Sequence, residues 1–167
     1  MMAGVAVEVR AITPADRAYV RRSLTDAFGA TEVAGHDELI DAATLPGAVA
    51  RLGDDPVGLL TYRPDADGGW EIVSFAAHRP GRGVGRAMMD WIRTEAGLAG
   101  GTRLWLITTN DNTTAMRFYQ RNGFDLIRLD RYSVDRARRL KPSIPTHADG
   151  IPIHHELELE LRLPPSP

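Results

Sequence analysis

The spacing of hydrophobic and polar positions along the chain predicts an alternation of strands and helices. Seven segments either alternate apolar with polar residues or are largely apolar, and each is bounded by turn residues, as strands are. They span residues 5–12, 48–53, 57–63, 70–77, 103–109, 124–132 and 156–163. Three segments carry apolar residues at helical spacing between capping residues, and they span 13–29, 84–98 and 110–123. The pattern is less regular from 30 to 46, where we expect a shorter helix over 37–43.

The last strand has the clearest alternation of all, because leucine and glutamate take turns along it. We predict that one face packs on the core and carries Leu157, Leu159, Leu161 and Leu163. The other face is predicted to point outward and carries Glu156, Glu158 and Glu160. The connection before this strand, 133–155, is long for a hairpin and begins with an irregular basic stretch. Long loops in compact domains are mostly functional lids or disordered segments.

This order of elements predicts an α/β (α+β) fold, in which a mixed sheet has helices on both faces. We find no internal repeat and no interdomain linker in the sequence. A single domain is therefore expected over residues 1–163, followed by a frayed C-terminal tail at 164–167.

The composition is that of a soluble globular protein, and it narrows the classes of function. With 167 residues and a net charge of -2, the chain has no bulk electrostatic reason to bind nucleic acid or an anionic membrane. The absence of cysteine excludes thiol catalysis and Cys-based zinc sites, and the five histidines lack metal-ligand spacing, so we predict no metal. The N-terminus lacks the features of a signal peptide, and no segment could span a bilayer, so a cytoplasmic location is expected.

The stretch "AAHRPGRGVGRAMMDW" runs from an apolar strand through a glycine-rich bend directly into a helix. Backbone N–H groups and the dipole at such a helix N-terminus favour an anion such as pyrophosphate. The alternative is that the glycines only let the helix pack closely on its strand. The bend is not a Walker A loop, because no Gly-Lys-Ser/Thr follows. It is also a poor dinucleotide fingerprint, because Met88 stands where the third glycine would be.

A second motif decides between these interpretations. The stretch "NDNTTAMRFYQRNGF" has the spacing N-x-x-A-x-x-F-Y-x-x-x-G-F, formed by Asn112, Ala115, Phe118, Tyr119, Gly123 and Phe124. Together with the glycine bend, it resembles the GNAT superfamily of N-acetyltransferases over about residues 57–132. The resemblance implies the GNAT fold, with a mostly antiparallel central sheet of about seven strands. One position departs from the family's Q/R-x-x-G-x-G/A loop, because Pro80 stands at the Gln/Arg position and offers no N–H group.

The resemblance also implies acetyl-CoA as the co-substrate and indicates the residues that would bind it. The pyrophosphate would lie on the loop and first helical turn formed by Gly81, Arg82, Gly83, Val84, Gly85 and Arg86. The pantetheine arm would pair with the strand edge at Val73, Ser74 and Phe75, as an added strand would. Asn112 would contact this arm from the neighbouring helix. These contacts require the sheet to open beside the strand that carries Val73.

Acetyl transfer to an amine needs a deprotonated amine, a polarised thioester carbonyl and a proton for the leaving thiolate. Tyr119 matches the family's general acid, although it could merely pack beside Phe118. Glu71 is the best candidate for a general base, and the alternative is a strand-end glutamate in solvent. Deprotonation relayed by water, with no dedicated base, is also open.

Two further features lie near the expected acceptor site. His36, beside Asp37, is in a region where the family often builds that site, although a lone loop histidine is more often simply solvated. A basic cluster in the long connection could meet an acidic acceptor or the 3′-phosphate of CoA, or it could form a solvated helix face. The cluster consists of Arg136, Arg138, Arg139 and Lys141.

These observations leave two functions of different classes. The first is an acetyl-CoA-dependent N-acetyltransferase that acts on a primary amine of a small molecule, a peptide or a protein. The second is a GNAT-fold module that binds or senses CoA without turnover. Tyr119 favours the first, because a non-catalytic copy would be free to lose it. The sequence leaves open whether the chain forms a homodimer.

Overall fold

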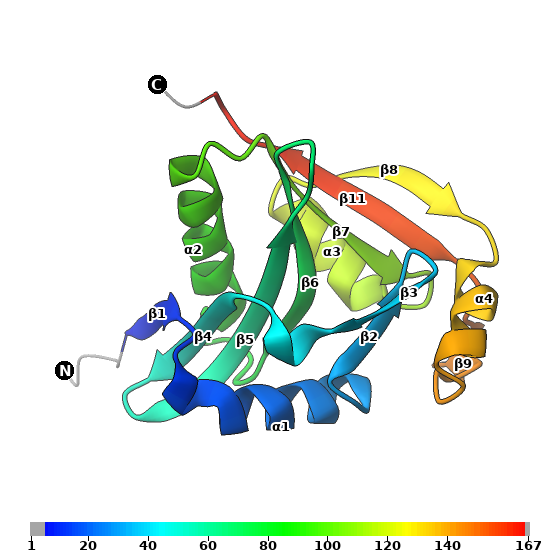
Figure 1. The fold of residues 1–167 in the computed structure, drawn as a ribbon, viewed down its shortest axis with the longest axis horizontal. Helices are drawn as coiled ribbons and strands as arrows, with labels where there is room; N and C mark the ends of the chain where they lie inside the picture. The colour runs from blue at the N-terminus through cyan, green and yellow to red at the C-terminus, as the bar shows by residue number, and fades with distance from the viewer. Residues whose placement is uncertain (1–5, 166–167) are drawn as a thin grey trace.

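The computed structural model describes residues 6–165, which build a seven-stranded sheet with helices against both faces (Figure 1). The strand order is β1-β4-β5-β6-β7-β11-β8, and every neighbouring pair is antiparallel except β6 and β7. The strands are β1 (Val7–Ala11), β4 (Gly47–Leu52), β5 (Asp55–Pro64), β6 (Gly69–Ala77), β7 (Arg103–Thr109), β8 (Asp125–Asp130) and β11 (Glu156–Arg162). This confirms the predicted mixed, mostly antiparallel sheet. Val5, at the start of the first predicted strand, lies outside the described residues.

Four α-helices accompany the sheet in the described residues: α1 (Arg17–Phe28), α2 (Val84–Leu98), α3 (Thr113–Arg121) and α4 (Ser133–Leu140). The chain enters α1 through a short 3₁₀ turn, Pro14–Asp16, and leaves it at Gly29, whose φ of 76° suits glycine. The predicted helix over 84–98 coincides with α2 at both ends. Within residues 6–165, no helix is both long and apolar enough to cross a bilayer.

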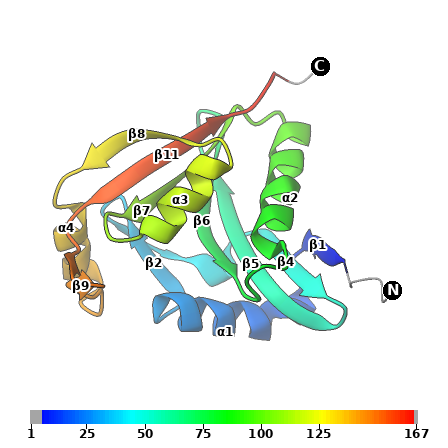
Figure 2. The ribbon, with the colours of Figure 1, turned by 180° about the vertical axis from the view of Figure 1, so that it is seen from behind.

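Two apolar clusters pack on the two faces of the sheet. The larger lies under α2 and α3, which cover the sheet in the view from behind (Figure 2), and is centred on fully buried residues such as Met88, Ile92 and Leu159. The smaller lies under α1 and contains Val20 and Leu24. Alternate residues of the central strands supply both clusters, as the two-residue period of a strand requires.

The prediction of a helix over 37–43 is wrong. This segment belongs to a hairpin, β2 (Glu32–Gly35) and β3 (Glu38–Asp41), followed by a short 3₁₀ turn, Ala42–Thr44. His36 and Asp37 form the turn, and both have positive φ angles, of 49° and 59°, as in a two-residue type I′ turn. The usual Asn-Gly or Asp-Gly signature of that turn is absent, so the local sequence does not reveal the hairpin. Tertiary contacts hold it: Gly35 lies so close to Ile107 of β7 that a Cβ atom would be 2.4 Å from the Ile107 side chain.

The long connection over 133–155 is not irregular, contrary to the prediction. It begins with α4, whose Val134 and Ala137 are buried, and continues into a small hairpin of β9 (His147–Ala148) and β10 (Ile151–Pro152). Most of the basic cluster serves to attach this segment. Arg136 bonds Asp37 and Asp130, while Arg138 bonds Asp135 and three backbone carbonyls. Lys141 donates to the carbonyls of Phe28 and Glu32, at 2.9 and 2.8 Å.

The prediction for the last strand is correct for Leu159, Leu161 and Leu163, which pack in the larger apolar cluster, and wrong for its glutamates. Leu159 is fully buried in the larger apolar cluster. The glutamates do not face solvent, because the opposite face of β11 is itself covered. Glu158 and Glu160 form ion pairs with Arg103, and Glu156 is only 5% exposed. The alternation of leucine and glutamate correctly predicted that β11 has two different faces. It did not predict that other parts of the protein would cover both faces.

Candidate active site

The sheet splits between its two parallel strands. β6 and β7 pair at only three positions, Gly69 with Arg103, Trp70 with Leu104 and Glu71 with Trp105. Beyond this point the strands diverge, so β6 from Ile72 onward is bonded on one side only, to β5. The opening that the resemblance requires therefore lies where the cofactor-binding edge was predicted.

A β-bulge marks the start of this open edge. Tyr62 of β5 pairs with Ile72 and the next residue, Thr61, pairs with Ser74, which leaves Val73 as the extra residue. A bulge leaves the extra residue outside the ladder and bends the strand. The Ser74 hydroxyl is buried and bonded to Thr61 at 2.7 Å, so only backbone groups of this residue are available to a ligand.

A cleft of about 570 Å³ extends from the split toward α1 and α4. Its walls come from β6, β7, the end of α1, the β2–β3 hairpin, α4 and the segment that follows α4. Most of the lining residues are apolar, and four carry charge: Glu71, Asp111, Lys141 and Glu156. Of the predicted site residues, Glu71, Val73 and Asn112 line this cleft together.

The glycine bend performs two different tasks. Gly81 and Gly83 have φ angles of 76° and 75°, and a Cβ atom on either would meet nothing within 4 Å. Gly83 is the N-cap of α2, and no side chain within residues 6–165 caps this end of the helix. Gly85 instead permits packing, because a Cβ there would lie 3.1 Å from the ring of Phe118. The packing interpretation therefore holds for Gly85, whereas Gly81 and Gly83 border open space at the N-terminus of α2.

Helix α3 brings the second motif against this bend. Asn112 caps α3, with its side-chain oxygen accepting from the amide of Ala115 at 3.1 Å, which leaves its amide nitrogen for other contacts. Tyr119 is 6% exposed and packs against Phe75, with ring centroids 5.9 Å apart. Burial raises the pKa of the Tyr119 hydroxyl well above its usual value, so the phenol remains protonated at neutral pH. Phe118 and Phe124 contact the same ring.

Glu71 is not a strand-end residue in solvent. It is 3% exposed, and its Oε2 accepts from Arg63 Nε at 2.5 Å. Its Oε1 lies 3.8 Å from Nε2 of His36, which is buried without a hydrogen-bond partner in the described structure. The His36 ring also contacts Trp105 edge-on, at 5.2 Å between centroids. His36 is thus held against the start of the split, and the expectation that it is simply solvated is wrong.

Two carboxylates of the cleft were not predicted as site residues. Asp111 Oδ1 and Glu156 Oε2 are both buried and have no hydrogen-bond partner within residues 6–165. Asp111 lies two residues after the end of β7 and could have been noticed from its place beside the N-cap Asn112. Glu156 gave no such signal, because its alternation with leucine is equally typical of a solvent-facing residue.

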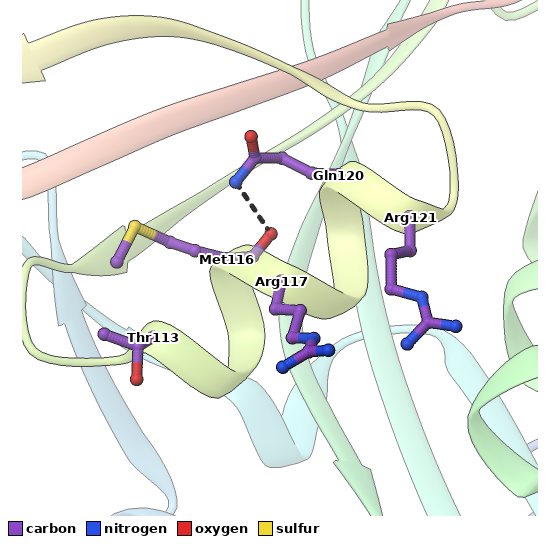
Figure 3. Close-up of a pocket in the computed structure, with 5 residues that line it drawn as sticks. All are labelled: Thr113, Met116, Arg117, Gln120 and Arg121. Carbon is purple, nitrogen blue, oxygen red and sulfur yellow. Dashed lines mark hydrogen bonds between the residues drawn. The ribbon is translucent and has the colours of Figure 1, made fainter.

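The outer face of α3 carries a shallow depression lined by Thr113, Met116, Arg117, Gln120 and Arg121 (Figure 3). Gln120 donates to the Met116 carbonyl at 3.2 Å. Arg117 and Arg121 extend to the same side of the helix, and neither has an ion pair in the described part of the chain. This face therefore presents two uncommitted guanidinium groups on the helix that contacts Gly85.

Solved acetyltransferases share this architecture. An IAA acetyltransferase from Bacillus cereus ATCC 14579 superposes with a TM-score of 0.73 at 18% identity, covering 95% of this chain and 100% of that one. A Bacillus subtilis acetyltransferase, solved in complex with CoA, has a TM-score of 0.66 at 17% identity and covers 95% and 98%. The fold is therefore that of an acetyltransferase.

Residues 17–124 match the acetyltransferase (GNAT) family. The protein YdhI of Bacillus subtilis (strain 168) is 34% identical over 143 residues, which cover 82% of this chain and 89% of that protein. The chain belongs to the GNAT family, and it is an N-acetyltransferase.

Proposed function

We propose that the protein transfers the acetyl group of acetyl-CoA to a primary amine of a small molecule or a protein. One observation carries this proposal: the parallel strands β6 and β7 separate after Glu71, beside the uncapped N-terminus of α2. A ligand with an extended amide-bearing arm and a pyrophosphate suits such a site, because unpaired strand edges and free helix amides are its natural partners.

The residues around the split fit acetyl-CoA. The N–H groups of Gly81, Gly83, Val84, Gly85 and Arg86, with the side chain of Arg82, would hold the pyrophosphate, since open space surrounds Gly81 and Gly83. The backbone of Val73, Ser74 and Phe75 and the free amide nitrogen of Asn112 would hold the arm. Arg117 and Arg121 are better candidates for the 3′-phosphate than the α4 cluster, which is largely committed to ion pairs and carbonyls. When bound, acetyl-CoA supplies the activated acetyl thioester.

Tyr119 is the proposed general acid. Its hydroxyl has no hydrogen bond to any described residue, so its proton is free to be donated to the departing thiolate sulfur. Its raised pKa keeps the proton in place until negative charge develops on that sulfur. The surrounding rings of Phe75, Phe118 and Phe124 keep water away and fix the position of the phenol.

Substitution of Tyr119 by phenylalanine tests this role. The Tyr119→Phe enzyme should keep its packing and its affinity for acetyl-CoA, measured as a thermal shift, while kcat falls by about 10²–10⁴-fold. Tyr132→Phe is the matched control, because Tyr132 is 51% exposed and lies outside the cleft. An acetyl-CoA-dependent thermal shift without acetyl transfer to any amine by the wild-type protein would favour the CoA-sensing module instead.

Glu71 is the proposed general base, with His36 beside it. The carboxylate lines the cleft at the split, and Arg63 fixes its orientation. Glu71→Gln should lower kcat within the range of about 10²–10⁴-fold that general base catalysis contributes. The deficit should be largest at low pH, where more of the acceptor amine is protonated. A deficit of equal size at every pH would show that Glu71 only positions Arg63 and His36.

A further inference from the structure

Glu156 differs from the other two glutamates of β11. Glu160 is paired with Arg103 and Arg162, and Glu158 with Arg103 and Arg128. Glu156 has no ion pair within the described residues, although it is 5% exposed. His36 contributes a backbone hydrogen bond to this carboxylate and a favourable charge when its ring is protonated, while Oε2 has no hydrogen-bond partner within residues 6–165. A buried carboxylate in this state is unfavourable while it is charged, unless it takes up a proton or a cation contacts it.

The place of Glu156 shows where that cation would come from. Its side chain lines the 570 Å³ cleft that also contains Glu71 and Val73 at the split of the sheet. Asp111 lines the same cleft with its own partnerless Oδ1. The lysine in the cleft wall, Lys141, is held by two backbone carbonyls. The carbonyls do not neutralise this ammonium, but the two carboxylates with partnerless oxygens outnumber it, and most of the residues that line the cleft are apolar.

We infer that the acceptor is a straight-chain aliphatic diamine or polyamine, whose non-reacting ammonium group is bound by Glu156. This inference rests on the proposed acetyl transfer and names its substrate class. The bound ammonium is the one that does not react, because a carboxylate that holds an ammonium favours its charged form, and a charged amine cannot attack a thioester. Methylene groups between the two nitrogens suit the apolar walls. A carboxylate on the acceptor would meet Glu156 and Asp111 and be repelled.

The reaction balances within this arrangement. The free amine forms a bond with the acetyl carbon, and the carbon–sulfur bond of the thioester breaks. The nitrogen loses a proton to Glu71, and the sulfur gains one from Tyr119. The ammonium on Glu156 takes no part in the bond changes and only fixes the distance from the carboxylate to the reacting nitrogen.

An amine series tests the inference on the wild-type enzyme alone. Straight-chain diamines of increasing length are compared with the monoamine and the ω-amino acid of the same length. The best diamine should exceed its monoamine in kcat/KM by about tenfold or more, because one charge-assisted hydrogen bond contributes at least that factor. The ω-amino acid should be the poorest of each trio. Monoamines or amino acids that equal the diamines at every length would overturn the inference but leave acetyl transfer itself established.

The variant Glu156→Gln tests whether Glu156 is the residue that favours diamines over monoamines. It should raise KM for the diamine, so that the diamine loses its advantage over the monoamine, and it should keep the thermal shift by acetyl-CoA. Glu160→Gln is the matched control, because it lies on the same strand outside the cleft and should keep full selectivity. Selectivity that survives in Glu156→Gln would assign the ammonium to another group and overturn the role of Glu156. If the wild-type protein binds acetyl-CoA but acetylates no amine, the proposed function and this inference fail together.

Discussion

Two buried carboxylates at opposite ends of the fold have opposite surroundings. Asp16, at the start of α1, is 6% exposed and accepts four hydrogen bonds, two from Arg10 and two from Thr13, at 2.7–2.9 Å. Glu156, at the start of β11, is 5% exposed, and its Oε2 has no hydrogen-bond partner among the described residues. The two carboxylates are thus almost equally buried, but both oxygens of Asp16 accept hydrogen bonds whereas Oε2 of Glu156 accepts none from the described residues.

The pKa values follow this difference. The hydrogen bonds from Arg10, assisted by those from Thr13, hold the pKa of Asp16 well below its usual range. Burial raises the pKa of Glu156, and the backbone of His36 offsets this only in part. A buried carboxylate whose oxygens are all hydrogen-bonded stabilises a fold, whereas one without these hydrogen bonds destabilises it. Such a destabilising group is typical of a functional site, where a bound ligand can supply the missing contact. The comparison therefore separates a structural carboxylate from the one that we propose binds the acceptor.

The largest expected effect on stability comes from Asp16. Asp16→Asn keeps the shape of the side chain but removes the charge that Arg10 and Thr13 contact. We expect the free energy of unfolding to fall by about 2 kcal/mol, because hydrogen bonds to charged groups are lost while Arg10 stays partly exposed. Thermal unfolding should show a decrease in Tm of about 4–8 °C. Asp26→Asn, at an exposed position of α1, is the control and should change little. If Asp16→Asn leaves Tm unchanged, the prediction that Asp16 stabilises the fold is wrong.

A smaller effect of the opposite sign is expected for Glu156. Glu156→Gln removes an uncompensated buried charge, so Tm should rise by about 1–3 °C at neutral pH, equivalent to a gain of somewhat under 1 kcal/mol. Denaturant unfolding should likewise show a higher free energy of unfolding for Glu156→Gln than for wild type. A clear loss of stability would mean that Glu156 is satisfied in solution, and the comparison with Asp16 would no longer hold.

The stabilities of Asp16→Asn and Glu156→Gln relative to wild type should depend on pH in different ways. The pKa of Glu156 is higher in the folded state than in the unfolded state, so between the two pKa values the folded state binds more protons. The wild-type protein therefore loses stability as pH rises from about 4 through the folded pKa of Glu156. The advantage of Glu156→Gln should therefore shrink as pH falls toward about 4. The folded pKa of Asp16 is lowered, so its contribution is present above about pH 4 and is lost only below that. Difference measurements against wild type separate Glu156 from His36, Asp37 and Asp130, which surround it.

Local sequence signals predicted the scaffold of the candidate site well. The glycine bend, α2, β7 and the N-cap of α3 lie where the sequence indicates, because periodicity and capping residues act over a few neighbouring positions. The wall of the cleft opposite this scaffold was predicted poorly. The β2–β3 hairpin uses a His-Asp turn without a sequence signature, and α4 is held by Arg136 and Arg138 through contacts with distant segments.

The sequence by itself determined the class of fold, the glycine bend, the Asn112–Phe124 motif and the position of Tyr119 on its helix, since these depend on local periodicity and spacing. Only the tertiary structure decided which polar residues are satisfied. Alternating glutamates on β11 are identical in sequence pattern, yet Arg103 and Arg128 form ion pairs with Glu158, whereas Glu156 has no ion pair within residues 6–165. The physical reason is that burial and charge pairing depend on segments far apart in the chain, which meet only when the hairpin, the split strands and α4 close around the cleft.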